Sequence, residues 1–152
     1  MSNVRPLPMA TRILPPSIYV ADTGMPKGRG AFAARTFAAG ELVEACPVVP
    51  FDLEIRSVPA EIERIMFGWG YLVGTPGPQA IVLGYGSVYN HDNPANMRYE
   101  AIVSTQELHF IAVRDILVDE ELTVNYNAHG GGAEWDDNGW FKRMRIKPIV
   151  ST

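Results

Sequence analysis

Apolar residues in this chain gather in short runs, and turn-forming residues separate most of them. Such runs are typical of β-strands when they are rich in Val, Ile or aromatic residues and bounded by Gly, Pro, Asn or Asp. We expect the pair at 98–104 and 108–114 to form a hairpin across the turn at 105–107. In full, the pattern predicts strands at Ser17–Ala21, Ala31–Ala34, Leu42–Pro50, Tyr71–Val73, Gln79–Leu83, Arg98–Ser104, Leu108–Arg114 and Leu122–Tyr126.

One segment carries the apolar spacing of a helix. Apolar side chains recur at three- and four-residue intervals from Ile62 to Trp69, and Pro59 supplies a suitable start. We therefore predict a helix over Pro59–Trp69. Residues 1–16 hold four prolines without clear periodicity, which indicates an irregular arm. The whole pattern predicts a mainly β fold with one or two short helices.

Composition narrows the class of protein. The chain has 152 residues, of which 47% are hydrophobic and 20% charged, as expected for one globular domain. Lys and Arg total 13 against 17 Asp and Glu, which gives a net charge of −4. This balance argues against direct nucleic-acid binding, which needs a basic surface. It favours a basic partner, such as a peptide rich in lysine or arginine.

The cysteine and histidine content argues against a metal centre. The single cysteine, Cys46, allows no internal disulfide and no Cys-rich zinc site, and the three histidines have no metal-ligand spacing. No apolar run approaches the ~18 residues of a membrane helix, and the N-terminus lacks the pattern of a secretion signal. We therefore expect no metal, no membrane association and a reducing compartment, most simply the cytoplasm.

Three segments carry residues suited to ligand binding. Gly28-Arg29-Gly30 allows a backbone to approach a ligand closely because its glycines have no Cβ. Asn90-His91 offers an amide that both donates and accepts hydrogen bonds. Tyr126 ends a predicted strand, where its phenol can project into a cleft. Each segment taken alone also fits a plain turn or a packed core residue, and that alternative stays open.

In this order, the segments resemble the SET-domain family of protein-lysine methyltransferases. The resemblance covers about residues 17–141, and two positions depart from the pattern: Asp92 stands where the family often has Ser, and Asn125 where it often has Asp. Without further cysteines, the chain is similar to a minimal, zinc-free member. The residues that carry the resemblance are Gly28-Arg29-Gly30, Ala39-Gly40-Glu41-Leu42, Asn90-His91 with Pro94 and Asn96, and Glu121-Leu122-Thr123-Val124-Asn125-Tyr126.

The resemblance implies a β-clip-like fold of small sheets with a C-terminal pseudoknot. It implies an N-terminal arm at 1–16, a SET domain at 17–127, and a segment at 128–152 that closes the site. In this family, S-adenosylmethionine (SAM) binds on one face, and the substrate lysine enters a channel from the opposite face. The activity implied is SAM-dependent methylation of a lysine amine. A non-catalytic module that binds SAM or a peptide, and a structural β-domain without a ligand, are the alternatives.

The resemblance also assigns roles to residues. Tyr126 is expected at the methyl-transfer pore, Tyr99 as a second channel tyrosine, and the Trp140-Phe141 pair over the cofactor or the channel mouth. Trp135 is the rival for that aromatic role, and a hydrophobic clasp is the alternative. Tyr71, Tyr85 and Tyr89 are expected to pack. The residues expected to bind the cofactor are Lys27, Gly28, Arg29, Gly30, Asn90, His91, Tyr126, Trp140 and Phe141.

The chemistry requires a neutral lysine amine, which is about 0.04% of a free lysine at pH 7. An apolar channel lowers the lysine pKa by desolvation, and alignment supplies further acceleration. Tyr126 is expected to orient the amine rather than deprotonate it. The expected partner is a protein or peptide with a lysine in a basic segment, and small zinc-free members of the family can also form homodimers. In a eukaryote, the location would be nuclear.

Two acidic clusters receive different interpretations. Asp119, Glu120 and Glu121 are expected to form a solvated turn, as most runs of charged residues do. Glu134, Asp136 and Asp137 are expected nearer the channel, where they could attract a basic peptide.

Overall fold

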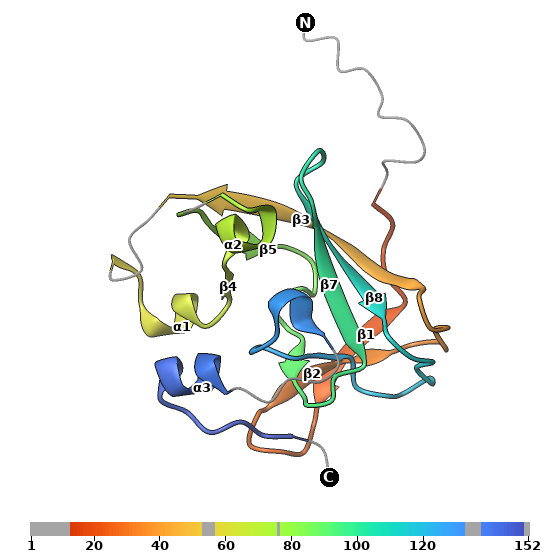
Figure 1. Ribbon diagram of the computed structural model, residues 1–152. Coiled ribbons are helices and arrows are strands. Elements are labelled where there is room, and N and C mark those ends of the chain that lie inside the picture. Colours follow the sequence, from red (N-terminus) through yellow and green to blue (C-terminus); the bar gives the residue numbers. More distant parts are fainter. Residues whose placement is uncertain (1–12, 53–56, 76, 133–137, 151–152) are drawn as a thin grey trace, which may run out of the picture.

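The computed structural model describes residues 13–52, 57–75, 77–132 and 138–150 of the chain (Figure 1). Its strands are β1 (Ile18–Asp22), β2 (Arg29–Ala33), β3 (Leu42–Phe51), β4 (Met66–Phe67), β5 (Gln79–Val82), β6 (Asn90–His91), β7 (Met97–Ile102), β8 (Glu107–Ala112) and β9 (Thr123–Val124). Its helices are α1 (Ala60–Glu63), α2 (Trp69–Val73) and α3 (Gly139–Met144), with a 3-10 turn, η3 (His129–Gly131). The predicted mainly β fold with short helices is confirmed.

The strands form three small sheets. The largest has the order β4-β5-β3-β8-β7, and its neighbours are antiparallel. β1 and β2 pair as an antiparallel ribbon, whereas β6 and β9 form a short parallel pair. The predicted hairpin is confirmed as β7 and β8, which pair from Met97↔Ala112 to Ile102↔Glu107. Figure 1 shows this hairpin beside the long strand β3, with α1 and α3 near each other on one side of the molecule.

The core lies on β3, β8 and the segments packed against them. Phe37, Met97, Leu108 and Phe110 are fully buried there, and Tyr89 packs its ring against Phe110 at a centroid distance of 4.7 Å. Full burial of each apolar side chain of this size contributes roughly 1.5–3 kcal/mol. Within the described ranges, no helix has the length and hydropathy needed to cross a membrane.

The turn before β2 brings the first glycine segment into the β1–β2 ribbon. Gly28 has a φ of +78°, a left-handed conformation that glycine adopts without a steric penalty. The carbonyl of Gly28 accepts hydrogen bonds from the Thr23 backbone N–H (2.9 Å) and hydroxyl (2.6 Å). Strand β2 therefore begins at Arg29, two residues earlier than predicted, and Gly30 lies within the ribbon opposite Ala21.

Backbone pairing brings the three sequence segments together. Asn90 and His91 lie beside Thr123 and Val124 in the β6–β9 pair, and β2 contacts the chain just before β9. The buried side chain of Asn96 stabilises this junction, because its Oδ1 accepts the Thr123 N–H (2.9 Å) and its Nδ2 donates to the Glu121 carbonyl (2.8 Å).

The predicted helix at Pro59–Trp69 is largely wrong. In the first part of the predicted range, only α1, at 60–63, is helical. Ile62 and Ile65 are 39% and 36% exposed, so they are not part of a buried apolar stripe. Met66 and Phe67 instead form β4, paired with Ile81 and Ala80 of β5. Pairing with an existing strand satisfies these backbone groups and overrides the helical spacing.

Residues 71–73 are helical, not a strand. They belong to α2, which ends at Gly74 in a left-handed conformation with a φ of +77°. An apolar run of three residues does not distinguish a strand from a helix by its periodicity. The last helix, α3, was not predicted, although it carries Trp140 and Phe141.

Candidate active site

Glu121 links the first two segments through its carboxylate. Its Oε2 lies 2.6 Å from the Lys27 ammonium, and its Oε1 accepts a hydrogen bond from Asn90 Nδ2 at 2.8 Å. Asn90 Nδ2 also donates to the Arg29 carbonyl at 2.8 Å. The side chains of Lys27 and Glu121 are only 8% and 16% exposed, so this network is largely shielded from water.

The network corrects one sequence interpretation. Glu121 is not part of a solvated turn, although Asp119 beside it is exposed. The ammonium of Lys27 is engaged by Glu121, and the expected contact of Lys27 with the cofactor stays a prediction. Position 30 requires glycine, because a Cβ there would lie 2.4 Å from Glu121 Oε1. Gly30, Asn90 and the Arg29 carbonyl are therefore brought together around one carboxylate.

His91 is a buried, neutral histidine next to Tyr126. Its Nδ1 accepts the Tyr126 backbone N–H at 3.1 Å, which assigns the ring hydrogen to Nε2. Burial lowers the His91 pKa from 6.5 to about 4, although Asp92 acts in the opposite direction. The ring lies 4.5 Å from the Phe141 ring, edge to face. Among the described residues, the Nε2 of His91 has no hydrogen-bond partner.

Tyr126 packs among aromatic rings and holds its hydroxyl in a defined direction. The hydroxyl donates to the Tyr89 carbonyl at 2.6 Å. The ring lies 4.8 Å from Trp140 and 5.5 Å from His91, measured between centroids. Burial raises the Tyr126 pKa far above its ordinary value, so the phenol remains protonated at neutral pH. Tyr126 can therefore donate and accept hydrogen bonds but cannot serve as a base.

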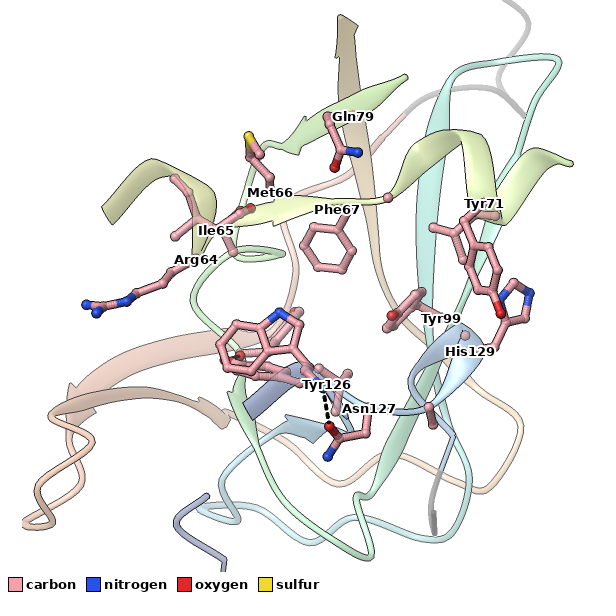
Figure 2. A pocket seen from close by; sticks show the side chains of 18 of the residues that line it. Arg64, Ile65, Met66, Phe67, Tyr71, Gln79, Tyr99, Tyr126, Asn127 and His129 are labelled. Carbon is pink, nitrogen blue, oxygen red and sulfur yellow. Dashed lines mark hydrogen bonds between the residues drawn. The ribbon is translucent and has the colours of Figure 1, made fainter. Parts of the chain in front are cut away.

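A cavity of about 560 Å³ opens on the other side of Tyr126, between the segment from α1 to α2 and the segments of η3 and α3. Figure 2 shows the rings of Phe67 and Tyr99 directed towards its interior, and Tyr126 also lines the cavity. Phe67 and Tyr99 contact each other edge to face, with centroids 5.4 Å apart. Burial raises the pKa of Tyr99 to about 12, so this second phenol is also neutral.

The rim of the cavity contains residues that the sequence did not single out correctly. Tyr71, expected to pack in the core, is 75% exposed and contacts His129 edge to face at 4.5 Å (Figure 2). Tyr89 is buried and Tyr85 packs against the core, as expected. Phe67 also lines the cavity and was missed, because β4 was mistaken for helix.

The two aromatic residues of α3 have different surroundings: one lines the cavity, and the other packs against His91. Trp140 lines the cavity, and its backbone N–H donates to Asn127 Oδ1 at 3.0 Å, drawn as a dashed line in Figure 2. Phe141 is buried against His91 and does not line the cavity. Trp135 and the acidic residues Glu134, Asp136 and Asp137 lie outside the described residues.

Tyr126 contacts both His91 and the cavity. The glycine segment, Asn90 and His91 do not line the cavity, whereas Tyr99, Tyr126 and Trp140 do. Glu121 and Phe67 are the residues that sequence reasoning missed. The described part of the chain shows no group of three or more His, Cys, Asp or Glu side chains arranged to hold a metal ion.

Comparison with known proteins identifies the family. The family model for the SET domain matches residues 28–127. The histone-lysine N-methyltransferase of Schizosaccharomyces pombe named as specific for H3 lysine-37 is 30% identical over 122 residues, which are 80% of this chain and 79% of the relative.

Solved structures support the same fold. A Plasmodium falciparum protein named as a candidate histone methyltransferase aligns with a TM-score of 0.59 at 21% identity, over 75% of this chain and 96% of its own. A chain of the Chaetomium thermophilum Polycomb Repressive Complex 2, in a humanized mutant, aligns with a TM-score of 0.63 at 19% identity, over 79% of this chain and 16% of its own. With a family match over most of the chain, the protein belongs to the SET-domain family of SAM-dependent protein-lysine methyltransferases.

Proposed function

We propose that this protein transfers a methyl group from SAM to the side-chain amine of a lysine in a protein substrate, with Tyr126 between the two binding sites. The observation that carries this proposal is the position of Tyr126. Its backbone binds His91, while its ring lines the aromatic cavity with Tyr99. The cavity would accept the lysine, and the neighbourhood of Gly30, Asn90 and His91 would hold the cofactor.

The residues present fit a cofactor that carries hydrogen-bond acceptors and a charged amino-acid portion. Two buried donors, His91 Nε2 and Asn125 Nδ2, have no partner among the described residues. His91 lies in the β6–β9 pair, and Asn125 comes directly after it. Buried donors of this kind normally have an acceptor, which a ligand can supply. Phe141 beside His91 offers an apolar ring surface, and Asn90 with the Arg29 carbonyl offers polar groups. When bound, SAM supplies a methyl group on a positively charged sulfur.

The cavity favours the neutral form of the substrate amine. Its interior near Tyr126 is formed by aromatic side chains, and desolvation there disfavours an ammonium. The lysine releases its proton to solvent, because the phenols of Tyr99 and Tyr126 both remain protonated. The Tyr99 hydroxyl makes no hydrogen bond to the described residues and is directed into the cavity (Figure 2), which leaves it available to orient the amine.

A histone-type peptide is the substrate that we propose. The S. pombe relative is named for activity on a lysine of histone H3. The net charge of −4 favours a basic peptide over nucleic acid. A histone substrate would place the protein in the nucleus of a eukaryotic cell rather than in the cytoplasm that the single cysteine suggested.

The test is incubation with SAM labelled on its methyl group and a panel of lysine-containing histone and ribosomal-type peptides, followed by mass spectrometry. We expect one peptide to gain methyl mass at a lysine, and the same peptide with that lysine changed to arginine to gain none. Saturable SAM binding without transfer to any peptide or to intact histones would contradict the proposal and favour a non-catalytic binding module.

A further inference from the structure

The core beneath the cavity contains a carboxylate that the proposed chemistry does not use. Glu44 lies on β3, is only 5% exposed, and forms no ion pair with the described residues. Its Oε2 accepts a short hydrogen bond from the Tyr89 hydroxyl, and its Oε1 accepts the Tyr85 backbone N–H at 3.0 Å. Burial of a carboxylate is costly unless such bonds compensate it, so this group needs a structural or functional explanation.

Both bonds of Glu44 go to the segment that joins β5 to β6. The chain turns closely over the carboxylate at Gly84, where a Cβ would lie 2.5 Å from Glu44 Oε1. Further along the same segment, Gly86, Ser87 and Tyr89 line the cavity. Glu44 therefore ties one wall of the cavity to the central sheet.

Tyr89 connects the carboxylate to the proposed catalytic phenol. Its side-chain hydroxyl donates to Glu44, and its backbone carbonyl accepts the Tyr126 hydroxyl at 2.6 Å. The Tyr89 ring is 1% exposed and packs against Phe110, so the ring has little freedom to move. The hydrogen bond to Glu44 holds the buried Tyr89 ring in place, and the ring in turn fixes the position of the Tyr89 carbonyl.

In the hydrogen bond between Tyr89 and Glu44, the donor and the acceptor are fixed. Burial, reinforced by the charge of Glu44, raises the Tyr89 pKa well above its ordinary value, so the hydroxyl stays a donor. A carboxylate is a strong acceptor for such a donor and gives a shorter, better-defined hydrogen bond than a neutral group.

We propose that Glu44 is a positioning residue for methyl transfer, acting through Tyr89 to hold the carbonyl that orients the Tyr126 hydroxyl at the cavity. The proposal rests on the proposed function of Tyr126 for its catalytic consequence. Its structural content, the dependence of the Tyr126 hydroxyl on the Glu44–Tyr89 bond, holds without any bound cofactor.

The test compares Tyr89→Phe with Tyr85→Phe as a matched control. Tyr85 is on the same segment, but only its backbone N–H bonds to Glu44, so its substitution leaves that bond in place. In protein labelled with ¹³C at the tyrosine Cζ and free of cofactor, we expect Tyr89→Phe to shift the Tyr126 resonance and Tyr85→Phe to leave it unchanged. We expect Glu44→Gln to shift the same resonance, which Tyr126→Phe identifies by its loss.

The kinetic measurement uses the same variants with SAM and the unmodified peptide that gains methyl mass in the wild-type assay. We expect Tyr89→Phe to lower kcat about tenfold, as loss of one positioning hydrogen bond predicts, with KM for both substrates close to wild type. In a Tyr126→Phe background the Tyr89→Phe change should have no further effect on kcat, whereas a general loss of folding would reduce it again.

The outcomes separate the two proposals. An unshifted Tyr126 resonance in both Tyr89→Phe and Glu44→Gln would overturn the positioning role, and so would a loss of kcat that is fully additive with Tyr126→Phe. If the wild-type protein methylates no peptide, the proposed function fails, while the resonance measurement still decides whether Glu44 positions Tyr126.

Discussion

The Lys27 ammonium lies 2.6 Å from the Glu121 carboxylate, although 94 positions separate the two residues in the sequence. The pair joins the turn before β2 to the segment before β9. Because Glu121 also accepts the Asn90 amide, one carboxylate holds parts of all three sequence segments in place. The expected cofactor site therefore depends on an ion pair that the sequence motifs do not reveal.

Glu121→Gln should destabilise the protein. The substitution keeps the size of the side chain but leaves the Lys27 ammonium, whose side chain is 8% exposed, without a charged partner. An uncompensated charge at a buried ion pair costs about 3 kcal/mol. Chemical denaturation measures the change in the free energy of unfolding.

Glu100→Gln is the matched control for that measurement. Glu100 pairs with Arg98 at 3.0 Å, but both side chains are more than 40% exposed, so loss of the pair should cost less than about 1 kcal/mol. Equal destabilisation by the two substitutions would show that the Lys27–Glu121 pair is not a shielded one.

Gly30→Ala should weaken SAM binding. The new Cβ would lie 2.4 Å from Glu121 Oε1, so the carboxylate must move away from Asn90 or Lys27. Loss of one hydrogen bond to a charged group corresponds to an affinity lower by roughly tenfold or more, measured by titration calorimetry. Asn90→Ala removes the same contact from the other side and should have a similar effect.

Gly132→Ala serves as the control, because a Cβ at Gly132 meets no atom of the described residues within 4 Å and its φ of −54° suits alanine. Its SAM affinity should equal that of the wild type. If Gly30→Ala binds SAM as tightly as Gly132→Ala does, Glu121 and Asn90 do not support the cofactor site.

The sequence predicted local strands well because their signal is local. The hairpin of β7 and β8 follows from alternation on neighbouring segments, and the order of motifs gave the family. The pairing of Asn90 with Thr123 in parallel strands depends on contacts between distant segments, which no periodicity encodes.

Two of the errors share one physical origin. Met66 has a helical spacing with Ile62, yet an available strand edge on β5 determines the structure of Met66 and Phe67. Glu121 is in an acidic run that resembles a solvated turn, yet the distant Lys27 removes it from water. In both cases a tertiary contact outweighs a local preference, and a single sequence does not display that contact.

Tyr126→Phe should bind SAM normally but lose most methyl transfer. The substitution keeps the ring and its contacts with Trp140 and His91, and removes only the hydroxyl that donates to the Tyr89 carbonyl. Loss of alignment at a reacting centre lowers kcat by roughly 100-fold. Steady-state kinetics with labelled SAM measures kcat, and calorimetry measures SAM affinity. Activity at the wild-type level would remove the Tyr126 hydroxyl from the mechanism.

The protein should lose stability as the pH falls from 6.5 to 4, because of His91. Burial lowers the pKa of this residue from 6.5 in the unfolded chain to about 4 in the folded protein. Between these two values the unfolded state binds the additional proton, so stability increases with pH across this window and is fully present above it. Protonation would also place a charge next to the ring of Phe141, where burial disfavours it.

His91→Gln isolates this effect, because glutamine does not titrate and its carbonyl can still accept the Tyr126 N–H that His91 Nδ1 accepts. Urea denaturation at pH 7 and pH 5 should show a clear loss of unfolding free energy in the wild type and a smaller loss in the variant. Glu120, whose pKa is lowered below its ordinary value, is present in both proteins, so its contribution cancels in the comparison. Equal losses in the two proteins would mean that His91 accepts its proton as readily in the folded state as in the unfolded chain.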